Sequence, residues 1–138
     1  MKNILILCTG NSCRSQIAHG YFKKLSKNKC IIYSAGIETH GLNPNAVKTM
    51  LRDDIDISTH TSNNVNEYSD INFDYIITVC DHANESCPNI PSKHALRIHK
   101  NFFDPSKIKN SSNPQKDFDK CRDEIKNFSI EFYNKYIN

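Results

Sequence analysis

The amino-acid sequence predicts an α/β fold in which helices cover both faces of a parallel sheet. Four short apolar runs alternate along the chain with segments of helical periodicity, which is typical of such folds. Two of these runs end at cysteines, Cys8 and Cys80. Because ligands bind beyond the carboxyl ends of parallel strands, these two residues mark the edge of the sheet where a site is expected.

The predicted strands cover residues 4–8, 31–33, 75–79 and 95–98. The first is a continuous apolar run that breaks into small polar residues, as a buried parallel strand does where it enters a loop. The third is rich in β-formers, and the fourth is the weakest of the four. Residues 81–91 are polar and contain two prolines, so they are predicted to form a loop.

Three helices are predicted between and after these strands. Residues 15–25 carry apolar side chains on one face. Asn43 followed by Pro44 offers an N-cap with proline at the first helical position, which starts the second helix. Near the end of the chain, apolar residues recur in steps of three and four, and they predict a C-terminal amphipathic helix: Phe118, Cys121, Ile125, Phe128 and Phe132.

Length and composition fit one soluble globular domain, residues 1–138. The apolar fraction of 38% and the charged fraction of 24% exclude a disordered chain. The net charge is only +3 and the lysines are scattered, which gives no case for binding nucleic acid. No apolar run is long enough for a signal peptide or a membrane span. We therefore expect a cytoplasmic protein that acts as a monomer away from membranes.

Six cysteines are many for a small cytoplasmic protein. Their even number would also suit a secreted disulfide framework, but the missing signal argues against secretion, and cytosolic thiols are kept reduced. In the cytosol, clustered cysteines indicate metal binding or redox catalysis.

The loop after the first strand carries the pattern of an oxyanion site. It reads Cys8, Thr9, Gly10, Asn11, Ser12, Cys13, Arg14 and Ser15. Its backbone N–H groups and the helix N-terminus form a nest for a tetrahedral anion, Gly10 lets the backbone fold closely, and Arg14 can bind two oxygens. The same field favours a thiolate nucleophile at Cys8, to which Ser15 could donate a hydrogen bond. The alternative is a buried cysteine that merely ends a strand.

This stretch resembles a known signature. Residues 8–16 (CTGNSCRSQ) are similar to the signature of the thioredoxin-coupled arsenate reductases, which share the fold of the low-molecular-weight protein tyrosine phosphatases. Residues 34–44, 78–80 and 122–125 also match, so the resemblance spans nearly the whole chain. It implies a three-layer fold with a four-stranded parallel sheet flanked by helices.

The resemblance also implies that Cys8, Cys80 and Cys87 form a thiol relay. Cys8 would attack arsenate, Cys80 would displace arsenite from Cys8, and Cys87 would move the disulfide outward. A thioredoxin-like dithiol, at about −270 mV, would then reduce the Cys80–Cys87 disulfide. No bound cofactor is implied, and phosphate and sulfate are expected to compete with arsenate.

Two other interpretations of the second and third cysteines stay open. A zinc ion could be held by Cys80, His82, Cys87 and His94, but these spacings are not those of common zinc modules, so no metal site is predicted. The two cysteines could also be inert buried thiols.

Some members of the resembling family bind potassium beside the loop through Asn, Ser and acidic side chains. Asn11 and Ser34 fit that pattern. His19 and Asn63 stand where the acidic groups are expected, so the pattern is incomplete in this chain.

Asp104, followed by Pro105, comes after the fourth predicted strand. By resemblance, Asp104 is the general acid that protonates the leaving oxygen. Taken alone, Asp-Pro is a common turn dipeptide. Residues 101–103 read Asn-Phe-Phe where Gly-Phe-Asp is more usual, which puts the details of this loop in question.

The sequence thus predicts an arsenate reductase with weak phosphatase side activity. One alternative is a low-molecular-weight protein tyrosine phosphatase, which needs the same loop and acid but no relay. Such phosphatases commonly carry tyrosines just after Asp-Pro, whereas this chain has Ser106 and Lys107. A non-catalytic module that binds oxyanions or redox partners is the other alternative.

Overall fold

The computed structural model describes residues 1–85, 92 and 94–138. Its strands and helices are β1 (Lys2–Cys8), α1 (Arg14–Ser26), β2 (Cys30–Gly36), α2 (Pro44–Leu51), β3 (Tyr75–Thr78), α3 (Asp81–Glu85), β4 (Leu96–His99) and α4 (Pro114–Phe132). Two 3-10 turns, Val65–Tyr68 and Pro105–Lys107, and a π-helical turn, Tyr133–Ile137, complete the described elements. None of the described helices combines the length and apolar character that crossing a membrane requires.

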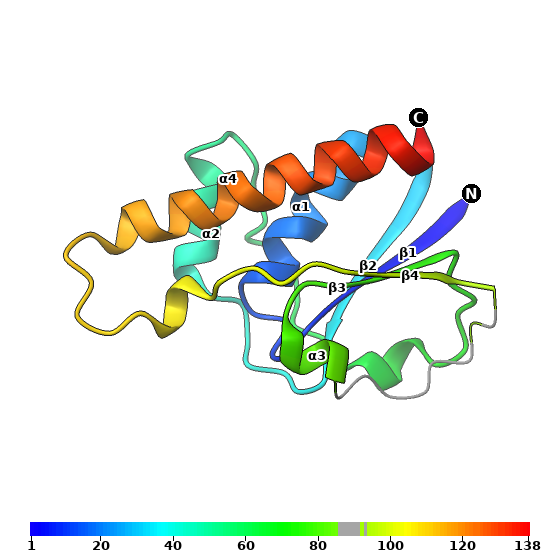
Figure 1. The fold of residues 1–138 in the computed structure, drawn as a ribbon, viewed down its shortest axis with the longest axis horizontal. Coiled ribbons are helices and arrows are strands. Elements are labelled where there is room, and N and C mark those ends of the chain that lie inside the picture. Colours follow the sequence, from blue (N-terminus) through cyan, green and yellow to red (C-terminus); the bar gives the residue numbers. More distant parts are fainter. Residues whose placement is uncertain (86–91, 93) are drawn as a thin grey trace.

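The four strands form one parallel sheet in the order β2-β1-β3-β4 (Figure 1). The chain first builds outward from β1 to β2 and then crosses to β3, so the strand order reverses between β1 and β3. Ligands of open parallel sheets bind at such a switch point. Leu7 pairs with Thr78 here, and this register brings the carboxyl ends of β1 and β3 together. The predicted four-stranded parallel sheet is confirmed.

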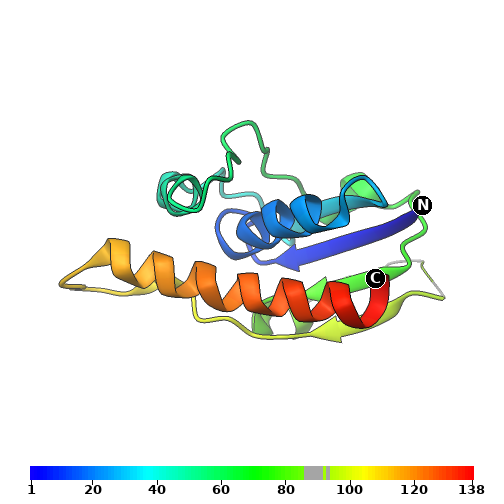
Figure 2. The same cartoon turned by 90° about the horizontal axis from the view of Figure 1, so that it is seen from above.

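Helices cover the sheet on both faces. In Figures 1 and 2, α1, α2 and α4 lie on one side, and α3 and the Val65–Tyr68 turn lie on the other. α1 and α4 pack side by side, with the rings of Phe22 and Phe132 at 5.2 Å between centroids. Because both faces are covered, all four residues from Ile4 to Leu7 are at most 1% exposed. This burial explains why β1 is a continuous apolar run rather than an alternating one.

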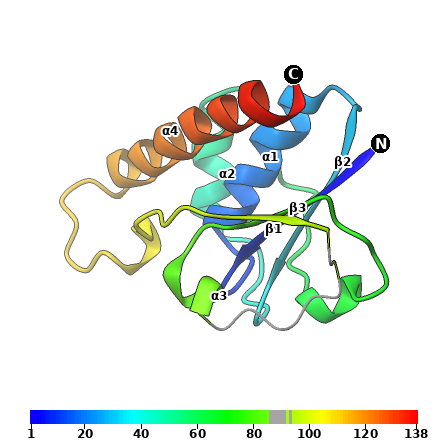
Figure 3. The same ribbon diagram turned by 45° about the vertical axis from the view of Figure 1, so that its right-hand side comes forward.

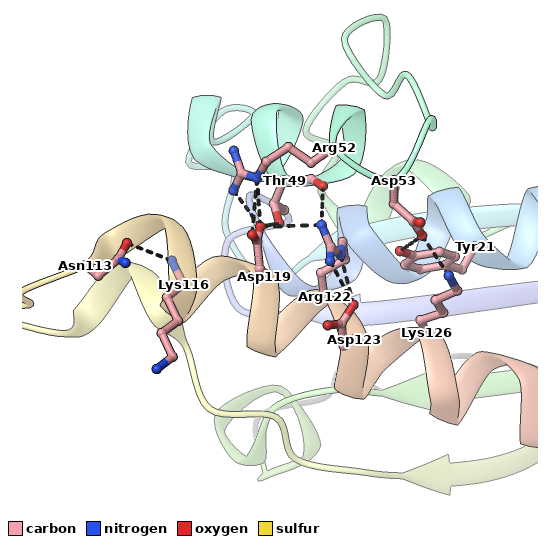
Figure 4. Close-up of polar contacts among 10 residues, drawn as sticks. All are labelled: Tyr21, Thr49, Arg52, Asp53, Asn113, Lys116, Asp119, Arg122, Asp123 and Lys126. Atoms are coloured by element: carbon pink, nitrogen blue, oxygen red, sulfur yellow. Dashed lines mark hydrogen bonds and ion pairs between the residues drawn. The ribbon is translucent and has the colours of Figure 1, made fainter.

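A polar cluster ties α2 to the α1–α4 layer (Figure 4). Asp119 of α4 accepts hydrogen bonds from the Thr49 hydroxyl at 2.6 Å and from the Arg52 guanidinium at 2.6 Å. Asp53, just beyond α2, accepts a hydrogen bond from the Tyr21 hydroxyl at 2.6 Å. These contacts fix α2, and with it one end of the segment between β2 and α2 that borders the site.

The predicted loop over residues 81–91 is wrong for its first five residues, which form α3 (Figure 3). The helix starts directly after Cys80, whose carbonyl accepts a hydrogen bond from the Asn84 N–H at 3.2 Å. Ala83 is fully buried on this side of the sheet, so packing rather than helix propensity stabilises the turn. Residues 86–91, and Cys87 with them, lie outside the described residues.

Candidate active site

The loop between β1 and α1 borders a pocket of about 110 Å³. Its described lining residues come from the loop, from the segment after β2 and from the turn after β4: Cys8, Thr9, Gly10, Ser12, Cys13, Arg14, His40, Asp104, Ser106 and Lys107. The structure thus brings the predicted nucleophile, arginine and acid to one pocket. Asn11 and Ser15, also predicted for this site, are fully buried and are not among its lining residues.

Asn11 holds the curl of the loop. Its backbone lies in the left-handed region, with φ 47°, which Asn tolerates better than most residues. Its side chain donates to the Ser15 hydroxyl and accepts from the Asn63 N–H, both at 2.8 Å, and its carbonyl accepts from Gln16 at 3.0 Å. Sequence reasoning missed Gln16, although it ends the matched signature. The predicted hydrogen bond from Ser15 to the Cys8 sulfur stays a prediction.

Arg14 is buried with its guanidinium facing the acid. It donates to the Phe102 carbonyl at 2.8 Å and lies 3.4 Å from Asp104. Burial is the largest effect and works against its charge, but the neighbouring cysteines and Asp104 together outweigh it and raise the pKa of Arg14. Its Nε is buried without a hydrogen-bond partner among the described residues. A buried donor of this kind suits an oxygen of a bound oxyanion.

Asp104 caps a turn with one carboxylate oxygen and faces the pocket with the other. One carboxylate oxygen caps the Pro105–Lys107 turn, accepting from the Ser106 N–H at 3.0 Å and from its hydroxyl at 2.7 Å. The other faces Arg14. The carboxyl group therefore lies beside the anion-binding groups, where a proton for a departing oxygen is needed.

Cys8 and Cys80 lie close enough to shift each other's pKa, and both are nearly inaccessible, at 4% and 2% exposure. Its interaction with Cys8, and then the contacts from the Thr9 hydroxyl and the Ala83 N–H, lower the pKa of Cys80 to about 5 despite burial. The pKa of Cys8 is raised instead, because its proton is shared with Cys80 and because it is buried. In the resting pair the lower pKa therefore belongs to Cys80 rather than to Cys8. Arg14 and the Thr9 N–H still favour an anion at Cys8, and the reactive thiolate predicted there stays a prediction.

The side chains of the incomplete potassium pattern bind other protein groups. Ser34 Oγ lies 2.7 Å from His19 Nδ1, and the His19 ring packs against the His60 ring at a tilt of 36°, with 4.5 Å between centroids. Burial, and then His60 and Lys23, lower the pKa of His19 to about 3, so a neutral imidazole stands where an acidic group was expected. The described residues contain no cluster of three or more metal-binding side chains. The zinc alternative also involves Cys87, which lies outside them.

Comparison with known proteins agrees with this geometry. The model of the family "Low molecular weight phosphotyrosine protein phosphatase" matches residues 3–137. Arsenate reductase 1 of Staphylococcus epidermidis is 45% identical over 125 residues, which cover 91% of this chain and 90% of that protein. The arsenate reductase of Bacillus cereus is 45% identical over 128 residues, which cover 93% of this chain and 94% of that protein.

Solved structures agree with these relatives. A structure described as an arsenate reductase in oxidized state has a TM-score of 0.84 at 25% identity, over 98% of both chains. Another, described as an arsenate reductase in the phosphate binding state, has a TM-score of 0.80 at 27% identity, over 98% of both chains. The phosphatase alternative is therefore less favoured. The chain belongs to the arsenate reductases of the low molecular weight phosphotyrosine protein phosphatase family.

Proposed function

We propose that this protein reduces arsenate to arsenite with electrons from its own thiols and is recharged by a thioredoxin-like dithiol. The observation that carries the proposal is a second cysteine, Cys80, beside Cys8 and joined to its loop through Thr9, next to Arg14 and Asp104. A phosphatase needs only the first sulfur. The second, with a pKa lowered to about 5, is a thiolate at neutral pH and a nucleophile next to the first.

In the first step the Cys8 sulfur attacks arsenic and an arsenic–oxygen bond breaks. The loop N–H groups and Arg14 hold the oxyanion, and the buried Nε of Arg14 supplies one further donor. The Cys8 proton passes to an oxygen of the bound oxyanion as the sulfur–arsenic bond forms. Asp104 protonates the departing oxygen, which leaves as water.

In the second step the Cys80 thiolate attacks the Cys8 sulfur. The sulfur–arsenic bond breaks, and its electron pair stays with arsenic, which leaves as arsenite. A Cys8–Cys80 disulfide forms, so the two thiols are oxidised as arsenic is reduced. Because Cys80 already contacts Cys8, this attack gains from proximity.

In the third step Cys87 attacks Cys80, which frees Cys8 and leaves a Cys80–Cys87 disulfide. Burial of Cys8 and Cys80 supports such a step, because an external dithiol has little access to a disulfide between them. The part played by Cys87 rests on the sequence, since this residue lies outside the described ranges.

We further propose that the protein works as a cytoplasmic monomer without a bound cofactor. The relay uses residues of one chain only. Five described cysteines carry free thiols, the state that cytosolic reductants maintain: Cys8, Cys13, Cys30, Cys80 and Cys121. Phosphate and sulfate should compete with arsenate because they present the same tetrahedral oxygens to the loop.

One assay tests the proposal: arsenite release with and without reduced thioredoxin, beside hydrolysis of an aryl phosphate. We expect repeated turnover only with thioredoxin, together with slow hydrolysis that thioredoxin does not change. Cys30→Ser is the control, because Cys30 is buried on β2 and is not among the residues that line the pocket. Aryl phosphate hydrolysis without any thioredoxin-dependent arsenite release would favour the phosphatase instead.

A further inference from the structure

A histidine outside the anion loop borders the oxyanion pocket. His40 lies in the segment between β2 and α2, far from the loop residues in sequence, yet it lines the same pocket as Arg14, Asp104 and Lys107. Its side chain is 52% exposed, as expected for a residue at the mouth of a pocket.

The backbone of this segment is fastened to the anion loop. The Glu38 N–H donates to the Thr9 carbonyl at 2.9 Å, and the His40 N–H donates to the Gly10 carbonyl at 3.0 Å. The Ser62 hydroxyl donates to the same Gly10 carbonyl at 3.0 Å. His40 therefore has a fixed place relative to the loop.

The imidazole of His40 lies directly against Gly10. A Cβ atom on residue 10 would stand 2.2 Å from His40 Nδ1 and 2.6 Å from Cγ, so only glycine leaves room for the ring there. On the other side of the ring, Glu38 Oε2 lies 2.7 Å from Nε2. Because the carboxylate accepts from Nε2–H, it orients the ring and leaves Nδ1 beside the loop.

We propose that His40, oriented by Glu38, determines specificity at this site by selecting small inorganic oxyanions over aryl phosphate esters. This inference deepens the proposed function and rests on it. The pocket of about 110 Å³ is far smaller than the several hundred Å³ that hold organic ligands. Its described lining contains no Phe, Tyr or Trp on which an aryl ring could stack, whereas Lys107 offers an ammonium donor to anionic oxygens. His40, with Nε2–H given to Glu38, donates to such oxygens through Nδ1–H as an imidazolium.

The test compares two substrates and one inhibitor in His40→Ala. Removing the Nδ1–H donor of the imidazolium should lower kcat/KM for arsenate about tenfold, mainly through KM. The wider mouth should raise kcat/KM for p-nitrophenyl phosphate. Sulfate protection of the active-site thiols against iodoacetamide should require about tenfold more sulfate. His94→Ala, at an exposed histidine before β4, is the matched control and should change none of these.

Two further variants separate the ring's contact from general damage to the loop. Glu38→Gln keeps an oxygen acceptor for His40 and should shift the substrate ratio less than His40→Ala. Gly10→Ala should displace the ring and shift the ratio as His40→Ala does. Combined with His40→Ala, it should shift the ratio no further, since the displaced ring is already absent.

The outcomes distinguish this inference from the proposed function. A parent protein that is protected by sulfate but releases no arsenite would refute the proposed reductase, and sulfate protection of His40→Ala would still test the role of His40 in binding oxyanions. If His40→Ala leaves both the arsenate-to-aryl-phosphate ratio and sulfate protection at parent values, the inference is wrong. Equal losses on both substrates would also overturn it, because they would make His40 a structural residue.

Discussion

The hydroxyl oxygen of Thr9 lies 3.3 Å from the sulfur of Cys80, although the two residues are 71 positions apart. A Cys80 thiolate can only accept, so the hydroxyl donates to that form and lowers the pKa of Cys80. A residue of the oxyanion loop thus also stabilises the nucleophile that we assign to the second step. The oxyanion loop and the second nucleophile are therefore in contact before any substrate binds.

Thr9→Val should raise the pKa of Cys80 toward its ordinary value, because valine keeps the shape of threonine but cannot donate. At neutral pH, arsenite release in a single turnover should slow by about tenfold, the effect of losing one hydrogen bond to a charged group. The pH dependence of Cys80 alkylation, followed by peptide mapping, measures the pKa directly. Thr9→Ser should restore it, and a Thr9→Val profile identical to the parent's would remove Thr9 from this role.

Asp104→Asn should slow aryl phosphate hydrolysis by about 100-fold, because asparagine cannot deliver a proton to the leaving oxygen. Its side-chain oxygen can still accept from Ser106, so the turn and the binding of oxyanions should persist. Sulfate protection against alkylation should therefore stay near the parent's value. Asp123→Asn, at an exposed position of α4, is the control. Parent-like turnover in Asp104→Asn would leave Asp104 as a turn residue only.

The sequence predicted the features whose signals are local. The strand at residues 4–8 is recognised because a sheet covered on both faces demands a continuous apolar run. The second helix is recognised at Asn43, whose side chain does cap it, accepting from the Asn45 N–H at 2.8 Å. The turn Val65–Tyr68 also has a local signal in the sequence, the capping box of Asn64 and Glu67, which marks the start of a helical turn.

The features that the sequence did not predict depend on segments that meet only in the fold. α3 is stabilised by burial of Ala83, but the polar residues on either side of Ala83 make this segment read as a loop in the sequence. The lowered pKa of Cys80 depends on its contacts with Cys8, Thr9 and Ala83, which a motif of consecutive residues does not contain. The position of His40 at the pocket likewise depends on the segment between β2 and α2, whose backbone is hydrogen-bonded to the anion loop.

The neutral His19 should make the protein lose stability in acid. Its pKa is about 3 in the folded state against an ordinary 6.5, so the unfolded chain binds a proton first as the pH falls. Above pH 6.5 the neutral His19 costs the folded protein no stability. As the pH falls from 6.5 toward 3, the free energy of unfolding drops by at most about 1.4 kcal/mol per pH unit. Urea unfolding at pH 7 and pH 5 measures the loss. His19→Gln, which cannot take up the proton, should show a smaller difference between the two pH values, and an equal difference would contradict the assignment.

The most direct test of the account mixes the fully reduced protein with excess arsenate and no external reductant. Each parent chain should release about one arsenite and stop, because the relay supplies two electrons before it needs recharging. Peptide mapping should then find a Cys80–Cys87 disulfide, and Cys87→Ser should stop with Cys8 joined to Cys80. Cys80→Ser should release little arsenite yet keep its aryl phosphate hydrolysis, which needs only the loop, Arg14 and an acid. A Cys80→Ser protein that reduces arsenate at the parent rate would contradict the relay.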